Sequence, residues 1–343
     1  MLHALSRYTR LGVRTIQAED EIAAVNMALG AAFAGQLGVT ATSGPGMDLK
    51  SETIGLAVAM ELPLVVIDVQ RAGPSTGMPT KTEAADLLAA LYGRHGESPL
   101  PVVAPCTPSD CFHAAIEAAR IAIRHRTPVI LLSDTFLANS SEPWLLPDVG
   151  TLPDIDPGFA TGPNQGDAFM PYLRDDRLAR PWAVPGTPGL RHRIGGLEKE
   201  DVTGNISYQP ENHDHMTRLR AERIARVEVP DLEVDDPDGG AELLVLGWGS
   251  SYGAIQGGAR RVRREQGVSV ATAHLRHLNP LPANVGDVLR SYERVLVPEM
   301  NMGQLVKILR AEYLVDCESF TKVAGLPIFT RDGIAEILER VGP

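Results

Sequence analysis

A strand-like run followed by a long loop places the strongest constraint on how this chain can fold. Residues 64–69 are largely apolar and β-branched, which is typical of a strand covered on both faces in a parallel sheet. Residues 70–81 form a loop that combines glycine, proline and hydroxyl side chains with Arg71. Because ligands of open α/β sheets bind where such loops leave the carboxyl ends of strands, the loop is a candidate site for a small anion. A solvated surface loop fits the same pattern equally well.

Segments typical of strands and helices alternate along residues 1–142. The expected strands cover residues 13–17, 39–42, 64–69, 101–104 and 128–133, and the expected helices cover residues 1–11, 19–35, 49–60, 82–91 and 107–124. This alternation predicts a doubly wound α/β fold, with a mostly parallel sheet and helices on both of its faces. Residues 241–343 repeat the alternation, with strands expected at 242–246, 268–274 and 294–298, and therefore predict a second α/β domain.

Residues 143–240 interrupt this rhythm and are predicted to be an ordered connection between the two domains. They are rich in proline and glycine, but they also hold several large aromatic side chains, which a free linker would not need. Within them, residues 213–215 read His-Asp-His, and a surface turn is favoured over a metal site because no further ligands are placed. Residues 247–250 read Gly-Trp-Gly-Ser, and close strand-to-helix packing is favoured there over a phosphate site.

Charge and cysteine content exclude several classes of protein. The net charge of −11 argues against broad binding to nucleic acid or to an anionic membrane. No apolar run approaches the roughly 18–20 residues of a membrane span, and no signal-peptide core is present at the N-terminus, so a cytoplasmic protein is expected. The three cysteines, Cys106, Cys111 and Cys317, are too few for a four-cysteine iron–sulfur site. No metal site is predicted on this chain.

Three ordered motifs, at residues 17–24, 40–46 and 70–83, resemble the α subunit of 2-oxoacid:ferredoxin oxidoreductases, in particular the 2-oxoglutarate type. Further motifs at residues 181–189, 195–199 and 298–305 are similar to the same family, so the resemblance covers nearly the whole chain. It implies that residues 1–142 form a pyrimidine-binding domain for thiamine diphosphate. It also implies that residues 241–343 form a domain like the C-terminal domain of transketolase.

The resemblance assigns roles to five residues. Glu21, whose position alone suggests a helix cap, falls on the catalytic glutamate that hydrogen-bonds the cofactor's aminopyrimidine and exchanges a proton with it. Arg71 falls on the arginine that binds the substrate carboxylate, for which a fork of two N–H donors is well suited. Thr80 falls on a position that shapes the substrate pocket. Ser43 and Gly44 lie on the turn that approaches the cofactor through backbone groups.

The family relationship also implies cofactors and partners outside this chain. Thiamine diphosphate is expected to be shared with a β subunit, which would carry Mg²⁺ and a 4Fe–4S cluster. Coenzyme A would be the co-substrate and ferredoxin the electron acceptor. The expected reaction is oxidative decarboxylation of a 2-oxoacid, with 2-oxoglutarate as the preferred candidate, in a heterotetramer of two α and two β subunits.

Two features depart from the family pattern. Family α chains begin earlier, with a loop whose threonine touches substrate, so residues 1–142 are expected to be an N-terminally truncated form of their domain. Asp48 and Lys50 also place charge where less polar side chains are expected. Two alternatives therefore stay open: a non-catalytic assembly subunit of the same fold, and another thiamine diphosphate enzyme. The sequence of residues 70–82, which resembles that of the oxidoreductases, argues against another thiamine diphosphate enzyme.

Overall fold

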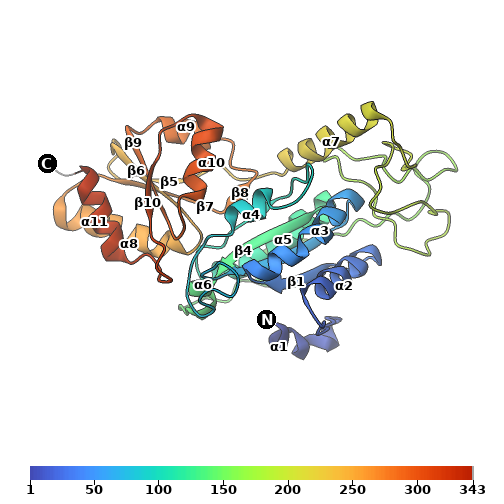
Figure 1. The fold of residues 1–343 in the computed structure, drawn as a ribbon, viewed down its shortest axis with the longest axis horizontal. Coiled ribbons are helices and arrows are strands. Elements are labelled where there is room, and N and C mark those ends of the chain that lie inside the picture. The colour runs from blue at the N-terminus through green and yellow to red at the C-terminus, as the bar shows by residue number, and fades with distance from the viewer. Residues whose placement is uncertain (342–343) are drawn as a thin grey trace.

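The computed structural model describes residues 1–341 as two α/β units joined by a long irregular connection (Figure 1). In the first unit, β1, β2, β4 and β3 run parallel, and β8 adds an antiparallel edge strand. In that order across the sheet, the strands are β1 (Gly38–Thr42), β2 (Leu64–Gln70), β4 (Pro128–Asp134), β3 (Val102–Val103) and β8 (His277–Asn279). The predicted mostly parallel sheet is confirmed.

Alternation of side chains along the central strands explains why helices cover both faces of this sheet. On β2, Val65 and Ile67 pack into a cluster with the helix α5 (Asp110–His125), whereas Leu64 and Val66 pack on the opposite face with α2 (Glu21–Phe33) and α3 (Gly44–Met60). The helices are α1 (Leu2–Leu5), followed by a 3₁₀ turn (Ser6–Leu11), α2 (Glu21–Phe33), α3 (Gly44–Met60), α4 (Leu87–Tyr92), α5 (Asp110–His125) and α6 (Thr135–Asn139). The doubly wound arrangement is thus confirmed as well.

Three local predictions in this unit are wrong. Residues 13–17 form no strand, and Ile16 is exposed, because no strand of residues 1–341 lies beside them. Helix α3 begins at Gly44 rather than at 49, since the expected turn is already its first turn. Helix α4 begins at Leu87 rather than at 82, because the backbone before it bonds to the second unit instead of to its own helix.

The connection is ordered by buried side chains rather than by regular structure. It contains the 3₁₀ turn η2 (Val149–Thr151) and one long helix, α7 (Pro210–Ala225), whose polar sequence gave no apolar periodicity to predict it. Trp182 is buried and donates from Nε1 to the carbonyl oxygen of Ala32 at 3.1 Å. Arg174 and Arg223 both pair with the buried carboxylate of Glu61 at 2.5 Å. These contacts fasten the connection to the first unit.

The second unit has a five-stranded sheet in the order β10-β9-β6-β7-β5, in which only β5 is antiparallel. The strands are β5 (Val234–Asp235), β6 (Leu243–Trp248), β7 (Ala271–Leu275), β9 (Arg294–Glu299) and β10 (Glu318–Thr321). The helices are α8 (Tyr252–Gln266), after a 3₁₀ turn (Gly249–Ser251), α9 (Val285–Arg290), α10 (Gln304–Tyr313) and α11 (Thr330–Val341). Strand β8 follows β7 in the chain but pairs with β3 in the first sheet, so it links the two units.

Across residues 1–341, the helices are too short or too polar to cross a membrane.

Candidate functional site

The predicted site residues lie at the carboxyl edge of the first sheet. Strands β1 and β2 are parallel neighbours, with Thr42 paired beside Asp68. Ser43 follows β1 directly, and Arg71 follows β2 directly. Since parallel strands end at the same edge, both residues leave the sheet where open α/β folds bind ligands.

Glu21 lies against the first turn of α3. Asp20 caps α2 by accepting from the N–H of Ala23 at 2.7 Å, which leaves Glu21 as the first helical residue. A Cβ atom at Gly46 would lie 2.6 Å from Cγ of Glu21, so only glycine allows this approach. Lys50, which is fully buried, donates from Nζ to the carbonyl oxygen of Glu21 at 2.8 Å, and burial lowers its pKa. The unexpected lysine therefore fixes the start of α2.

Ser43 and Gly44 form the N-terminus of α3. Ser43 is extended at the N-cap position, and Gly44 opens the helix, so the positive end of the helix dipole faces the same edge. A Cβ atom at Gly44 would lie 2.9 Å from Oδ2 of Asp86. A carboxyl group thus contacts the backbone at the turn that was predicted to approach a cofactor.

The sequence reasoning missed an acid pair beneath this turn. Asp68 is fully buried, and neither of its carboxyl oxygens accepts from an N–H or hydroxyl group among the described residues. Burial, together with Asp86, raises the pKa of Asp68 to about 8, and burial raises that of Asp86 to about 6. The pair therefore holds a proton near neutral pH. Its signal in the sequence was one aspartate inside an otherwise apolar strand.

The loop after β2 folds back on itself. The N–H of Ala72 donates to the carbonyl oxygen of Lys81 at 3.0 Å, and the N–H of Met78 donates to that of Ala72 at 2.9 Å. Arg71 and Thr80 therefore flank one hydrogen-bonded backbone pair. Arg71 is half-buried, and no acceptor within residues 1–341 reaches its buried Nε, whereas Thr80 is exposed. The roles assigned to these two residues stay predictions.

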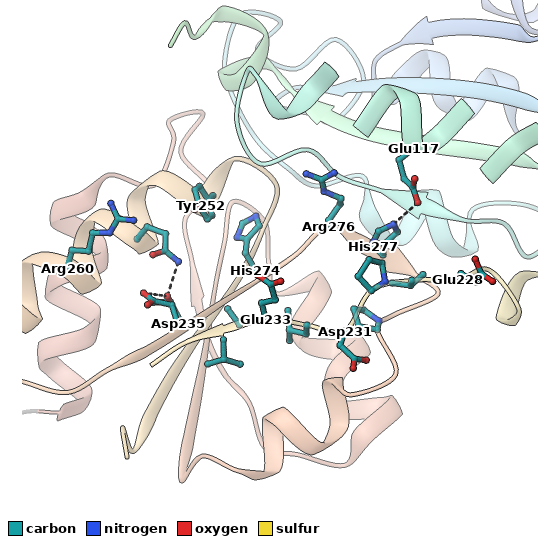
Figure 2. A pocket seen from close by; sticks show the side chains of 18 of the residues that line it. Glu117, Glu228, Asp231, Glu233, Asp235, Tyr252, Arg260, His274, Arg276 and His277 are labelled. Carbon is teal, nitrogen blue, oxygen red and sulfur yellow. Dashed lines mark hydrogen bonds and ion pairs between the residues drawn. The ribbon is translucent and has the colours of Figure 1, made fainter. Parts of the chain in front are cut away.

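A cleft of about 1230 Å³ lies between the two units, away from these residues (Figure 2). None of the five predicted site residues is among those that line it. His277 points toward Glu117, with Nε2 and Oε1 3.5 Å apart. Although burial opposes the shift, the neighbouring His277 and hydrogen bonds from Arg120 lower the pKa of Glu117 to about 2. Burial also lowers the pKa of His274 to about 4.

Two further motifs now have a structural explanation. His213 and His215 lie on α7 rather than in the predicted turn, and they contact the carboxylates of Glu198 and Asp201 at 2.7 and 2.9 Å. Among residues 1–341, no cluster of three metal-binding side chains is found. In the Gly-Trp-Gly-Ser turn, a Cβ atom at Gly247 would lie 2.4 Å from Ile255. That turn therefore packs β6 closely against α8, as favoured from the sequence.

Comparison with known proteins agrees with the motifs. The family described as "Pyruvate flavodoxin/ferredoxin oxidoreductase, thiamine diP-bdg" matches residues 1–210. The 2-oxoglutarate oxidoreductase subunit KorA of Mycobacterium tuberculosis is 60% identical over 98% of the chain. The structure of 2-oxoglutarate:ferredoxin oxidoreductase from Magnetococcus marinus, with 2-oxoglutarate, coenzyme A and succinyl-CoA bound, matches 99% of the chain with a TM-score of 0.93 and 34% identity.

The matches differ in how much of each relative they include. The chain spans 51% of the length of the M. tuberculosis subunit and 59% of the M. marinus chain. A split-gene transketolase matches 99% of the chain and 88% of its own with a TM-score of 0.54 and 11% identity, a likeness of fold alone. The chain belongs to the pyruvate flavodoxin/ferredoxin oxidoreductase family and carries its thiamine diphosphate-binding domain.

Proposed function

We propose that this chain is the α subunit of a 2-oxoacid:ferredoxin oxidoreductase that decarboxylates 2-oxoglutarate oxidatively to an acyl-CoA. The observation that carries the proposal is the meeting of Glu21, the N-terminus of α3 and Arg71 at one edge of the first sheet. The names of the matched relatives support 2-oxoglutarate as the substrate.

The residues present fit the aminopyrimidine half of thiamine diphosphate. Gly44 and Gly46 lack side chains, which lets the side chains of Asp86 and Glu21 lie directly against the first turn of α3. Glu21, which lies against that turn, would hydrogen-bond the ring and move a proton to or from it. When bound, the cofactor supplies the nucleophilic carbon and the electron sink for decarboxylation. Glu21 thus has the proton-transfer role on this chain.

Arg71 and Thr80 would bind the 2-oxoacid. The Arg71 guanidinium has donor capacity to spare, because its buried Nε has no acceptor within residues 1–341. A carboxylate would take two of its parallel N–H groups. Thr80, on the returning arm of the same loop, would contact the remainder of the substrate and favour a dicarboxylate.

The remaining parts of the reaction belong to partners in this proposal. A β subunit would bind the diphosphate and Mg²⁺ and carry the 4Fe–4S cluster, since this chain has only three cysteines. Coenzyme A would accept the acyl group and ferredoxin the electrons. Two α and two β subunits would form the complex. The relatives' designations as subunits support the need for a partner.

The test is Glu21→Gln in the complex reconstituted with a β subunit. The amide keeps the shape of the side chain but cannot exchange a proton, so decarboxylation should fall by about 10²–10⁴-fold. Glu19→Gln is the matched control, because Glu19 is exposed two residues earlier and should leave the rate unchanged. Near-normal turnover of the Glu21→Gln complex would contradict the proposed function and favour a non-catalytic assembly subunit.

A further inference from the structure

The turn after β9 in the second unit binds the segment between the Arg71 loop and α4. Asn301, which is 1% exposed, donates from Nδ2 to the carbonyl oxygen of Ala84 at 2.7 Å. The N–H of Ala84 donates in return to the carbonyl oxygen of Met300 at 3.1 Å. The two segments are therefore hydrogen-bonded in both directions at one residue.

Gln304 extends this attachment by one helical turn. Its Nε2 donates to the carbonyl oxygen of Ala85 at 2.5 Å, and its Oε1 accepts from the N–H of Leu88 at 3.0 Å. Residues 300–304 thus hold residues 84–88 through hydrogen bonds from both their backbone and their side chains. This attachment is also the reason that α4 begins five residues later than its sequence suggested.

Glu299 fixes the residues that make these bonds. Its Oε1 accepts from Nδ2 of Asn301 at 3.0 Å and from the N–H of Leu305 at 2.8 Å. Oδ1 of Asn301 accepts from the N–H of Gln304 at 2.8 Å. Since Asn301 is oriented by Glu299 and by the backbone of Gln304, its side chain is fixed before any ligand arrives.

The attached segment reaches the candidate site in two places. Gln70, the residue before Arg71, accepts from the N–H of Asp86 at 3.0 Å through Oε1 and donates to the carbonyl oxygen of Ser133 at 3.1 Å. The Asp86 carboxyl contacts Gly44, as described above. Both ends of the site therefore depend on where residues 84–88 lie.

We propose that Asn301 and Gln304 are positioning residues for the 2-oxoacid site: by holding residues 84–88 they fix Gln70 and, through it, the direction of Arg71. The inference rests on the proposed function, and it gives the second unit a role in substrate binding without any contact to substrate. Loss of the attachment should raise KM for the 2-oxoacid more than it lowers kcat, because Arg71 must then be ordered during binding.

The first test compares three variants of α10 in the reconstituted complex. Gln304→Ala should lower kcat/KM for 2-oxoglutarate by about 10-fold or more, because two hydrogen bonds are lost. Gln304→Glu keeps the acceptor for Leu88 and should lose less; it also serves if the alanine variant does not assemble. Lys307→Gln, on the exposed side of the same helix, should change nothing. Amide hydrogen exchange over residues 70–92 should quicken only in the Gln304 variants.

The second test is a double-mutant cycle with Arg71→Lys. If Gln304 acts through Arg71, adding Gln304→Ala to Arg71→Lys should cost no more than about 2-fold further in kcat/KM. Losses that multiply, or unchanged exchange over residues 70–92, would overturn the positioning role. By contrast, an Arg71→Lys complex with unchanged kcat/KM would refute the proposed function. In that case the exchange measurement still decides whether residues 84–88 are held by Gln304.

Discussion

Each sheet carries a buried carboxyl group at its carboxyl edge, but the two groups have opposite surroundings. Glu299 accepts from the N–H groups of Leu305 and Val306 at 2.8 and 3.1 Å and from Nε1 of Trp248 at 3.3 Å. Asp68 receives no N–H or hydroxyl donor from the described residues and faces the carboxyl group of Asp86 instead. At the edge of the second sheet, Glu299 therefore satisfies the nearby buried donors, so no ligand is needed there. The edge of the first sheet leaves a helix N-terminus and a proton-sharing pair for other groups, so one architecture serves once as support and once as a site.

Removing Glu299 should have the largest effect on stability. Glu299→Ala leaves several buried hydrogen-bond donors without an acceptor, and each such donor costs about 1–3 kcal/mol. The free energy of unfolding should therefore fall by roughly 3–5 kcal/mol. The measurement is the midpoint of urea unfolding, monitored by circular dichroism. The dependence of the free energy of unfolding on urea concentration should be unchanged. Glu312→Ala is the control, because Glu312 is an exposed glutamate on α10, the helix whose first N–H groups Glu299 accepts. If Glu299→Ala lowers the free energy of unfolding no more than Glu312→Ala does, Glu299 does not stabilise the edge of the second sheet.

Arg71→Lys should affect the first edge alone. Exchanging a fork of donors for a point charge should cost about 1–3 kcal/mol of transition-state binding for every 2-oxoacid. The measurement is kcat/KM for 2-oxoglutarate and pyruvate in the reconstituted complex. Arg260→Lys, on the exposed face of α8 beside the interunit cleft, should leave both values unchanged. Equal effects of the two substitutions would erase the functional difference between the edges.

Thr80→Met should separate the two acids rather than weaken both. If Thr80 has its proposed role, a larger apolar side chain on the returning arm of the loop should penalise 2-oxoglutarate over pyruvate by roughly 1–2 kcal/mol, because it would remove a polar contact to the distal carboxylate. The ratio of the two kcat/KM values reports this directly. An unchanged ratio would mean that Thr80 lies outside the pocket.

Asp68→Asn should change stability by an amount that depends on pH, and with a sign opposite to that of Glu299→Gln. Because the folded pKa of Asp68 is raised to about 8, the stability that this group contributes is present below pH 3.8 and is lost as pH rises towards 8. An amide does not titrate, so the variant should be more stable than the parent above pH 3.8, and the gain should grow as pH rises towards 8. Glu299→Gln should instead destabilise the protein. Urea midpoints at pH 5, 7 and 8 provide the check.

Local patterns predicted much of the fold, whereas long-range pairings could not be predicted. The alternation of apolar and polar segments placed β1, β2 and β4 because those strands are buried by their own neighbouring helices. Strand β8 was missed because residues 277–279 pair with β3, which lies more than 170 residues earlier. Similarly, the later start of α4 follows from bonds to Asn301 and Gln304, which no local signal in residues 82–91 reveals.

The residues of the candidate site also fall into those that the sequence predicted and those that it could not. Resemblance placed Glu21, Ser43 and Arg71 at positions that the sheet register brings to one edge. Asp86 could not be placed, since it meets Gly44 and Asp68 only after the loop has folded back. Lys50 looked misplaced as a charge, but its amine satisfies a backbone carbonyl at the start of α2. Buried polar residues were therefore the hardest to interpret without their partners.

The buried carboxylate of Glu61 makes the irregular connection part of the first unit's cooperative unfolding. One of its partners, Arg174, comes from a loop, and the other, Arg223, comes from α7, and both guanidinium groups are buried with it. Detaching the connection would leave the Glu61 carboxylate buried without its two partners, which is more costly than exposing a few loop hydrogen bonds. Residues 143–240 should thus resist proteases as long as the first sheet is folded, despite having little regular structure of their own.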